Sequence, residues 1–430
     1  MKAAFYTLGC KVNQYETEYM AEVLSKAGFE IVSPNEEADY YIINSCTVTA
    51  TADQKTRQNV RKFKRKHPDS VVILTGCMPQ AFPEQAQELK QADIVLTNKS
   101  NDEILDLINK HSTSHNRIVR IDKHQKGDKF KDCNIAHFSE RIRAFVKIED
   151  GCDRFCSYCI IPTSRGRVRS KSLESLKSEV KTLGENGIKE IVLVGINLSA
   201  YGKDCDFNLV DAVRICADDD NILRVRLGSL EPDHITDDVI EGLAKIEKFC
   251  SQFHISLQSG CNRTLKNMNR HYTADEYRIL CNKLNDTFDD CTLTTDVMVG
   301  FHDETEEDFA DSLEFVRSIG FQKIHTFPYS ERKGTVASKR GDNVPKHIKE
   351  KRAETMISLA DKIRFDYLKT LIGKEVSVLF ENMVAPGVFQ GYTKNYIPVR
   401  LQSENDIIGK EICVTVKSVD TENDCVISSL

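Results

Sequence analysis

Three cysteines stand close together in the segment GCDRFCSYC, at Cys152, Cys156 and Cys159. Three thiolates on one loop, with no local fourth Cys or His, can hold three irons of a cubane 4Fe-4S cluster and leave the fourth iron open. A zinc site normally takes its fourth ligand from a matching pair, and no such pair follows nearby. The spacing therefore predicts a 4Fe-4S cluster with one iron free to bind a ligand. The alternative is three core cysteines that cluster by coincidence.

A second set of cysteines is spread over the first eighty residues. Cys10 (TLGCKVN), Cys46 (INSCTVT) and Cys77 (LTGCMPQ) each follow the end of a predicted strand by one or two residues. Because neighbouring parallel strands end at the same edge of a sheet, these three side chains are expected to converge. The pattern predicts a second three-cysteine site, and three buried structural cysteines are the alternative.

The composition is that of a soluble globular protein, with 430 residues, 29% charged and a formal charge of −6. This length suits roughly three domains. No apolar run approaches the roughly 20 residues that span a bilayer, and no signal-type segment is evident, so we expect a cytoplasmic protein without membrane contact. Fifteen cysteines in such a chain favour metal or redox chemistry over disulfide bonds.

An α/β fold must position Cys10, Cys46 and Cys77. Short β-branched runs alternate with helix-period segments, which is typical of a parallel sheet covered by helices. The predicted strands are 2–8, 40–44, 71–75 and 94–97, and the helices between them include 16–27 and 52–66. We assign this α/β domain to residues 1–112, and the polar, weakly periodic residues 113–140 to a linker.

A second βα series surrounds Cys152 and predicts a central partial (β/α)6 barrel over residues 141–371, whose working face is the carboxyl edge of its strands. The predicted strands are 144–148, 190–194, 223–227, 253–257, 292–299 and 323–327. The helices include 173–183, 235–247, 274–284 and 306–319, with a closing helix at 346–371. Residues 372–430 alternate without helices and predict a small antiparallel β-barrel with strands at 375–380, 387–392, 397–401, 411–419 and 425–428.

A CxxxCxxC loop directly after the first strand of a six-unit βα barrel is similar to that of the radical S-adenosylmethionine enzymes. The resemblance implies that S-adenosylmethionine chelates the open iron through its amino and carboxylate groups. Electron transfer from the cluster then cleaves the sulfonium to a 5′-deoxyadenosyl radical, which abstracts an unactivated hydrogen.

The whole chain resembles the methylthiotransferase family of these enzymes. The resemblance rests on TLGCKVNQYETE, INSCTVT, GCDRFCSYCIIPTSRGRVRS, HISLQSGCNRTLKNMNR and PYSERKGT. Within the family, LGCKVNQYE resembles the branch that acts on N6-threonylcarbamoyladenosine beside the anticodon of tRNA. The sibling branch that acts on isopentenyladenosine typically has a CQMN-like continuation at this position.

The resemblance implies two 4Fe-4S clusters and S-adenosylmethionine as cofactors. The barrel cluster would cleave one S-adenosylmethionine, and the cluster at Cys10, Cys46 and Cys77 would hold or supply sulfur that a second S-adenosylmethionine methylates. The radical would take the hydrogen from C2 of the modified adenine, where the methylthio group is delivered. The partners implied are tRNA carrying threonylcarbamoyladenosine, a reducing electron donor such as flavodoxin or ferredoxin, and a sulfur source.

Polar and small residues at the carboxyl ends of the barrel strands are the expected S-adenosylmethionine contacts. They are Gly195, Asn197, Ser229, Glu231, Gln258 and Gly300, and a turn or cap is the alternative for each. Arg165, Arg167 and Arg169 can meet the S-adenosylmethionine carboxylate or phosphates, or form a solvated basic turn. The chain has His302-Asp303 where the family usually has Pro-Gly in GFPGET, which is expected to change the backbone beside the adenine site.

RNA contacts are expected at two places. The last domain resembles the TRAM RNA-binding barrel, yet from Gly373 onward it has five Lys or Arg against eight Asp or Glu. Its contribution is therefore expected from Tyr392, Lys394, Asn395 and Tyr396, through stacking and one phosphate contact. Residues 55–67 hold seven Lys or Arg and no acid, and are either a phosphate-binding face or a solvated helix face.

Two other functions remain open on the sequence. One is methylthiotransfer to another substrate, either isopentenyladenosine in tRNA or a ribosomal-protein aspartate. The sequence around Cys10 argues against it. The other is a non-catalytic iron-sulfur or RNA-binding protein, which has no use for Glu231, Gln258 and a complete barrel. Failure of the reduced protein to cleave S-adenosylmethionine would favour this second alternative.

Overall fold

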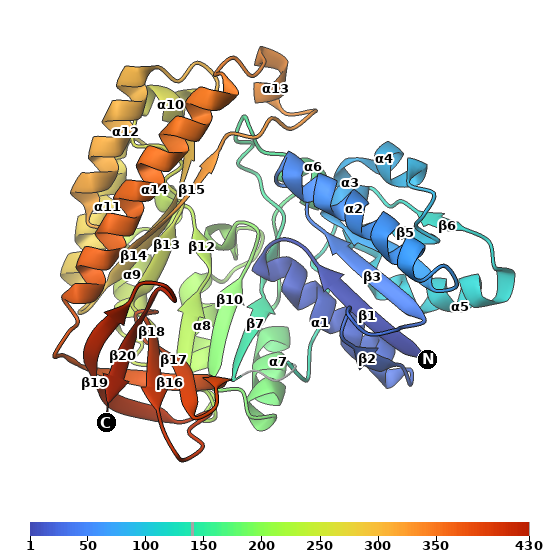
Figure 1. Cartoon of the computed structure of the whole chain (residues 1–430), viewed down its shortest axis with the longest axis horizontal. Helices are drawn as coiled ribbons and strands as arrows, with labels where there is room; N and C mark the ends of the chain where they lie inside the picture. Colours follow the sequence, from blue (N-terminus) through green and yellow to red (C-terminus); the bar gives the residue numbers. More distant parts are fainter. Residues whose placement is uncertain (139–141, 430) are drawn as a thin grey trace.

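Residues 1–138 and 142–429 are described by a computed structural model, in which an α/β domain, a βα barrel and a small β-barrel follow one another along the chain (Figure 1). The amino-terminal sheet has six parallel strands in the order β2-β1-β3-β4-β5-β6. Its strands are β1 Lys2–Thr7, β2 Glu30–Val32, β3 Tyr40–Ser45, β4 Val71–Gly76, β5 Ile94–Leu96 and β6 Ile118–Arg120. Its helices are α1 Lys11–Lys26, α2 Ala50–Lys66, α3 Cys77–Ala81, α4 Pro83–Glu88 and α5 Ile104–Ser114, with a 3-10 turn at Asn98–Glu103.

The predicted parallel sheet is confirmed, and two strands were missed. β3 is buried along its whole length because it lies inside the sheet with helices on both faces, and its run YYIINS is apolar enough for that place. β2 and β6 have three residues each and are mostly exposed, so they leave little pattern. β6 pairs with β5, and the sheet therefore extends into the predicted linker. Residues 139–140 of that linker and Arg141, where the barrel was predicted to begin, lie outside the described residues.

The central part forms a partial barrel from two parallel sheets, ordered β11-β10-β7 and β12-β13-β14-β15. Its strands are β7 Arg143–Lys147, β10 Glu190–Val194, β11 Arg224–Leu227, β12 Ser229–Leu230, β13 Gln252–Ile255, β14 Thr292–Val299 and β15 Lys323–Pro328. A short ribbon, β8 Glu149–Asp150 with β9 Arg169–Ser170, frames the CxxxCxxC loop. One large apolar core lies between the strands and the surrounding helices.

The helices of this part follow the expected βα alternation. They are α6 Ile161–Arg165, α7 Leu173–Glu185, α8 Leu209–Ala217, α9 Asp237–Ala244, α10 Asn262–Asn267, α11 Ala274–Thr287, α12 Glu306–Ile319, α13 Val336–Arg340 and α14 Lys346–Lys369, with 3-10 turns at Leu198–Ala200 and Pro232–His234. Side-chain capping begins several of them, including α11 and α12. The hydroxyls of Thr273 and Thr305 each accept a hydrogen bond from the backbone N–H three residues later, and the acidic side chain of that later residue accepts one from the threonine N–H. The predicted closing helix is α14.

The carboxy-terminal part is a closed five-stranded barrel in the order β16-β17-β18-β20-β19. Its strands are β16 Glu375–Ala385, β17 Val388–Thr393, β18 Pro398–Gln402, β19 Glu411–Asp420 and β20 Cys425–Ser429. The predicted small barrel is confirmed, but it is not antiparallel throughout, because β18 and β20 pair in parallel. A ring with an odd number of strands cannot alternate direction all the way round, so one parallel pair is unavoidable.

This small barrel packs against the amino ends of the central strands. Arg224, at the start of β11, donates to the Tyr392 carbonyl at 2.7 Å, and Thr292, at the start of β14, donates to the Asn395 carbonyl at 2.7 Å. The Tyr392 and Tyr396 rings stack on each other at 4.8 Å, and the Arg143 guanidinium covers both. The loop predicted to stack on RNA is therefore largely engaged within the chain. Among the described residues, every helix is too short or too polar to span a bilayer.

Candidate active site

Cys10, Cys46 and Cys77 converge at the carboxyl edge of the amino-terminal sheet. The Cys10 and Cys77 sulfurs both lie near the amide oxygen of Asn13, at 3.8 and 3.9 Å. Cys46 approaches from the next strand: at Gly9, whose φ is +114°, a Cβ atom would lie 2.9 Å from the Cys46 Cβ. Only glycine allows this close approach of the two loops. The predicted convergence of three distant cysteines is present in the structure.

Buried cations and amides surround this cysteine group. Burial and the neighbouring Cys77 and Cys10 sulfurs together raise the pKa of the Cys46 thiol to about 12. Three thiolates held this closely need a bound cation to compensate their charge. Asn13 fixes the loops by donating to the Leu8 and Ser45 carbonyls, each at 2.9 Å. The donor set therefore fits an iron-sulfur cluster.

Arg165 belongs to this first cysteine group and not to the S-adenosylmethionine edge. Its side chain is 1% exposed, and its Nε donates to the Cys77 sulfur at 3.3 Å. Its other nitrogens donate to the Asn13 amide oxygen at 2.7 Å and to both Glu16 carboxylate oxygens. The expectation that it meets the S-adenosylmethionine carboxylate is corrected, because α6 directs it across the domain junction.

The two other arginines of the SRGRVRS segment are also engaged elsewhere. Arg169 is buried, donates to the Arg165 and Arg167 carbonyls and lies 3.5 Å from Asp150. Arg167 is exposed, pairs with Asp153 at 2.9 Å and covers the Phe155 ring. In the described structure none of the three reaches the carboxyl ends of the later barrel strands.

Replacing Arg165 with methionine is expected to lower the free energy of unfolding by about 3 kcal/mol or more, because Glu16 then loses a buried partner. Arg167→Met is the matched control two residues away. Its ion pair is exposed, so its effect is expected to stay below about 1 kcal/mol. Chemical denaturation of the two variants measures the difference. Equal losses would show that the buried guanidinium does not stabilise the junction.

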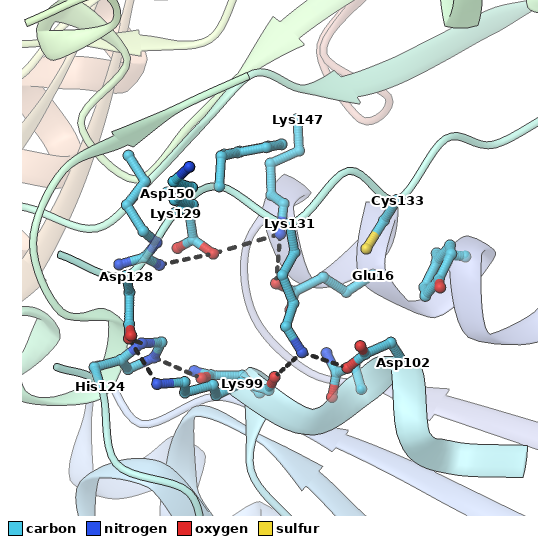
Figure 2. A pocket seen from close by; sticks show the side chains of 15 residues that line it. Glu16, Lys99, Asp102, His124, Asp128, Lys129, Lys131, Cys133, Lys147 and Asp150 are labelled. Carbon is cyan, nitrogen blue, oxygen red and sulfur yellow. Dashed lines mark hydrogen bonds and ion pairs between the residues drawn. The ribbon is translucent and has the colours of Figure 1, made fainter. Parts of the chain in front are cut away.

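Ion pairs around a pocket of about 300 Å³ hold the two domains together beside Arg165 (Figure 2). Lys147 from β7 reaches Glu16 of α1 at 3.1 Å and Asp150 at 3.4 Å. Although burial raises the pKa of Asp150, the cations of Lys147 and Arg165 hold it below its usual range. Figure 2 shows Lys147, Glu16 and Asp150 on one side of the pocket. This junction fixes the first cysteine group relative to the barrel.

The loop with Cys152, Cys156 and Cys159 lies after β8, at the carboxyl edge of the barrel. Gly151, with φ +95°, starts it, and a Cβ atom there would lie 2.0 Å from the Arg167 carbonyl oxygen. The Cys159 N–H donates to the Cys156 carbonyl at 3.0 Å, which folds the loop into a turn. Burial raises the pKa of the Cys159 thiol to about 12, and the Cys156 sulfur adds to the rise.

Arg270 links this loop to the barrel edge. Its guanidinium donates to the Cys156 sulfur at 3.3 Å and to both carboxylate oxygens of Glu231, at 2.5 and 3.2 Å. Glu231, expected to contact S-adenosylmethionine, therefore already has a buried cationic partner. Arg270 was not anticipated, although it lies inside the quoted segment HISLQSGCNRTLKNMNR, because nothing local shows that it turns back towards the loop.

Three polar atoms at the barrel edge are buried without a hydrogen-bond partner among the described residues. They belong to Glu149, Asn197 and Gln258. The Asn197 N–H donates to Glu149 at 2.7 Å, and Gln258 has a left-handed backbone, with φ +66°. Unsatisfied buried polar atoms are costly, so their presence together fits a bound polar ligand such as S-adenosylmethionine. Glu149 was not among the expected contacts.

Gly195 and Gly300, the two glycines expected to contact S-adenosylmethionine, lie against different parts of the structure. Gly195 lies against Glu149, whose carboxylate oxygen would be 2.7 Å from a Cβ atom, and it lines a cavity together with Ser229. Gly300 lies under α14, where a Cβ atom would be 2.4 Å from the Lys349 Cγ. The structure therefore gives Gly300 a packing role.

The turn after β14 contains a residue with a left-handed backbone conformation that is not glycine. Asp303 has φ +61°, and its N–H donates to the Asn343 side chain at 2.9 Å while the Asn343 amide returns a bond to its carboxylate. Arg263 also donates to the Asp303 carbonyl at 2.6 Å. The expected change of backbone at His302-Asp303 is thus offset by these bonds, which hold Asp303 in the conformation that a glycine adopts freely.

A cavity of about 700 Å³ extends from Cys10 to the inner face of the barrel. Gly195 and Ser229 line it on the carboxyl edge, and Tyr396 lines it from the small barrel. Its inner wall is polar, with Gln252, His254, Thr294, Asp296, Lys323 and His325 on neighbouring strands. The space therefore opens to one cysteine of the first group and to the expected cofactor edge of the second.

In this wall the His254 Nε2 lies 3.3 Å from an Asp296 carboxylate oxygen, and the His254 Nδ1 lies 3.0 Å from the Thr294 hydroxyl. The sequence expectations did not include these residues, because the contacts were expected only at the carboxyl ends of strands. Polar residues two apart within a barrel strand, such as Thr294 and Asp296, were the available signal, since alternate residues of a barrel strand point inward.

No group of three or more His, Cys, Asp or Glu within residues 1–138 and 142–429 is gathered closely enough to enclose a single metal ion. A zinc ion holds its sulfur ligands at about 2.3 Å. A cubane cluster instead binds each thiolate at a different corner, and so accepts a wider spacing.

Comparison with known proteins assigns the two larger domains. Residues 2–97 match the uncharacterized protein family UPF0004, and residues 146–316 match the Radical SAM superfamily. A radical S-adenosylmethionine methyltransferase from Kitasatospora setae, TsrM, has a similar fold, with a TM-score of 0.53 at 13% identity over 76% of this chain and 72% of that one.

Curated relatives match over nearly the whole length. The threonylcarbamoyladenosine tRNA methylthiotransferases MtaB of Bacillus subtilis and Thermotoga maritima are 36% and 37% identical, over 96% and 97% of this chain and 93% and 94% of theirs. A tRNA-2-methylthio-N(6)-dimethylallyladenosine synthase of Finegoldia magna is 34% identical over 96% of this chain and 91% of its own. Enzymes of this kind use S-adenosylmethionine and two 4Fe-4S clusters. The chain belongs to the radical S-adenosylmethionine tRNA methylthiotransferase family.

Proposed function

We propose that this enzyme adds a methylthio group to C2 of N6-threonylcarbamoyladenosine beside the anticodon of tRNA. The cavity that Cys10 and Ser229 line carries the proposal, because a single adenine base can face both residues at once. Relatives that bear the name of this activity share 35 to 37% of their residues with the chain. Several dimethylallyladenosine synthases are 32 to 35% identical to the chain.

Six cysteines hold the two clusters in this proposal. Cys152, Cys156 and Cys159 bind the cluster that takes S-adenosylmethionine at its open iron. Cys10, Cys46 and Cys77 bind the other one. When bound, the first of these clusters would supply the electron that cleaves S-adenosylmethionine to a 5′-deoxyadenosyl radical, and the second would hold the sulfur that another S-adenosylmethionine methylates.

The chain's own residues bind and orient the reactants. Asn197, Gln258 and Glu149 offer their unpartnered polar atoms to S-adenosylmethionine, while Gly195 and Ser229 leave room for it. Arg270 holds Glu231 and donates to Cys156, so it positions the cluster loop. Arg165 donates to Cys77 and stabilises the negative charge of the other group.

An electron donor such as flavodoxin or ferredoxin and a separate sulfur source complete the proposal. The reaction requires both a low-potential electron and sulfur that the chain does not contain. All fifteen cysteines are free, as expected for a protein of a reducing compartment, and we place the enzyme in the cytoplasm with its tRNA.

Mass analysis of tRNA nucleosides from cells lacking the protein tests the substrate. We expect 2-methylthio-N6-threonylcarbamoyladenosine to disappear and its unmethylthiolated precursor to accumulate, with both restored by the wild-type gene. Loss of 2-methylthio-isopentenyladenosine instead would assign the enzyme to the sibling substrate. Unchanged tRNA together with a changed ribosomal protein would move it outside tRNA modification.

Reversing exposed charges on α2 is expected to weaken binding of all tRNAs alike. Thr56, Val60 and Phe63 face the sheet, while Arg61, Lys62 and Arg65 are exposed. Lys64 is excluded from the test because it pairs with Asp93 at 3.0 Å. Affinity for tRNA that comes from phosphate contacts falls as the salt concentration rises. A variant with Arg61, Lys62 and Arg65 all replaced by glutamate should therefore also show a weaker dependence of affinity on salt concentration.

The matched control reverses two exposed lysines, Lys177 and Lys181, on helix α7 of the barrel's outer surface. Filter binding of unmodified and modified tRNAs over a range of salt concentrations measures both variants. If the α2 variant binds as the control does, the basic run is a solvated helix face.

A further inference from the structure

The ionic groups of the central cavity are almost all paired. Lys323 reaches Asp424 at 2.6 Å, and His254 reaches Asp296 at 3.3 Å. Lys11 is different. Among the described residues its ammonium has no carboxylate or carbonyl partner, and its recorded side-chain contact is with the Phe145 ring, 5.7 Å from the centroid.

The surroundings of Lys11 are cationic. Besides burial, the largest influences on its ammonium are the guanidinium groups of Arg143 and Arg226, which lower its pKa, while the Glu190 carboxylate opposes them. Each already has its own acid, since Arg226 pairs with Glu190 at 2.9 Å and Arg143 lies 3.4 Å from Glu381. The region therefore has one more positive group than its carboxylates neutralise, and the surplus faces the cavity.

Helix formation does not explain a lysine at this position. Lys11 is the first residue of α1, whose first turn contains no acid. A cation at a helix amino terminus opposes the helix dipole, at a cost of about 0.3–1 kcal/mol. Its half-buried side chain lines the cavity directly beside Cys10. An anion bound in the cavity would offset both the helix-end cost and the surplus charge.

We propose that Lys11 binds the carboxylate of the threonylcarbamoyl substituent and thereby selects the modified base. This rests on the proposed function above. The substituent carries a single carboxylate, and Lys11 is the one ammonium among the described residues lining the cavity that has no acidic partner. An isopentenyl group would leave the ammonium facing apolar carbon without a partner, which disfavours that base.

The test compares kcat/KM on two anticodon stem-loops that differ in one group. One carries N6-threonylcarbamoyladenosine, and the other carries its carboxamide, which has the same shape without the charge. With the wild-type enzyme we expect the carboxamide to react about 30-fold less well or worse, since a buried charge pair is lost. Lys11→Gln should lose as much on the carboxylate substrate and nothing further on the carboxamide.

Two further variants separate charge recognition from structural damage. Lys11→Arg should recover much of the preference for the carboxylate, and Lys26→Gln, the same change at the exposed end of α1, should behave as wild type. Formation of 5′-deoxyadenosine without RNA should be equal in all of them.

Equal reaction of wild type with carboxylate and carboxamide would overturn the inference without needing any variant. So would a Lys11→Gln enzyme that keeps the full preference. If the wild type modifies neither stem-loop but modifies an isopentenyl one, the proposed function fails and this inference with it.

Discussion

Replacing Cys152, Cys156 and Cys159 with alanine is expected to abolish 5′-deoxyadenosine formation. It should also lower the iron content of anaerobically reconstituted protein from about eight to about four per chain, because each three-cysteine group is proposed to hold one four-iron cluster. Without these thiolates the CxxxCxxC loop would hold no cluster, so nothing would pass an electron to the sulfonium. Iron analysis and chromatography of the reduced reaction measure both effects.

The matched control replaces three cysteines outside both groups, Cys205, Cys291 and Cys413, each of which is at least partly exposed. It should keep the full iron content and full cleavage. Cleavage of S-adenosylmethionine that persists in the Cys152, Cys156 and Cys159 variant would mean that the radical chemistry is assigned to the wrong residues.

A second triple variant replaces Cys10, Cys46 and Cys77 with alanine. It should keep the activity that the first triple variant loses. Cleavage of S-adenosylmethionine should continue, because the barrel loop is intact, while the methylthio product should fall below detection. Iron should again be halved. Measuring the methylthio product and 5′-deoxyadenosine in the same reaction gives the ratio of product formed to S-adenosylmethionine cleaved. A variant that still makes the methylthio product would reduce these three cysteines to structural residues, whatever its iron content.

Arg165 complicates this separation in a useful way. Its contact with Cys77 comes from α6, directly after the loop of the other cysteine group. Losing Cys77 therefore removes one partner of a buried guanidinium that still keeps Asn13 and Glu16. We accordingly expect the second triple variant to remain folded, which makes its chemistry interpretable.

The six cysteines were predictable because their positions follow from the order of the strands. Cys10, Cys46 and Cys77 come after three strands that are neighbours in the sheet, β1, β3 and β4, so a parallel sheet brings them together. Cys152, Cys156 and Cys159 needed only local spacing. In both groups the information lies within a few residues of each cysteine.

Arg165 and Lys11 show where sequence reasoning ends. Arg165 was expected at the cofactor edge because it follows the cluster loop, but it points into the other domain. In the sequence, Lys11 could be recognised only as part of a motif. Its lack of an acidic partner depends on how Glu190, Glu381 and Asp424 pair with other cations in the folded chain. Such assignments depend on tertiary packing that no local pattern encodes.

The barrel strands hold an intermediate case. His254, Thr294 and His325 lie on three adjacent strands and face one cavity. Their alternation with apolar neighbours could be recognised in the sequence, but a polar residue inside a strand is equally typical of a solvent-exposed face. Only closure of the strands around a cavity distinguishes the two.

The most direct test of the account incubates the reduced, reconstituted enzyme with S-adenosylmethionine, sulfide and two tRNAs, one carrying N6-threonylcarbamoyladenosine and the other isopentenyladenosine. We predict that nucleoside mass analysis finds the 2-methylthio derivative on the threonylcarbamoyl tRNA, with 5′-deoxyadenosine formed alongside. Product on the isopentenyl tRNA alone would contradict the substrate assignment. Absence of both 5′-deoxyadenosine and product would contradict the account of this cavity as a radical methylthiotransferase site.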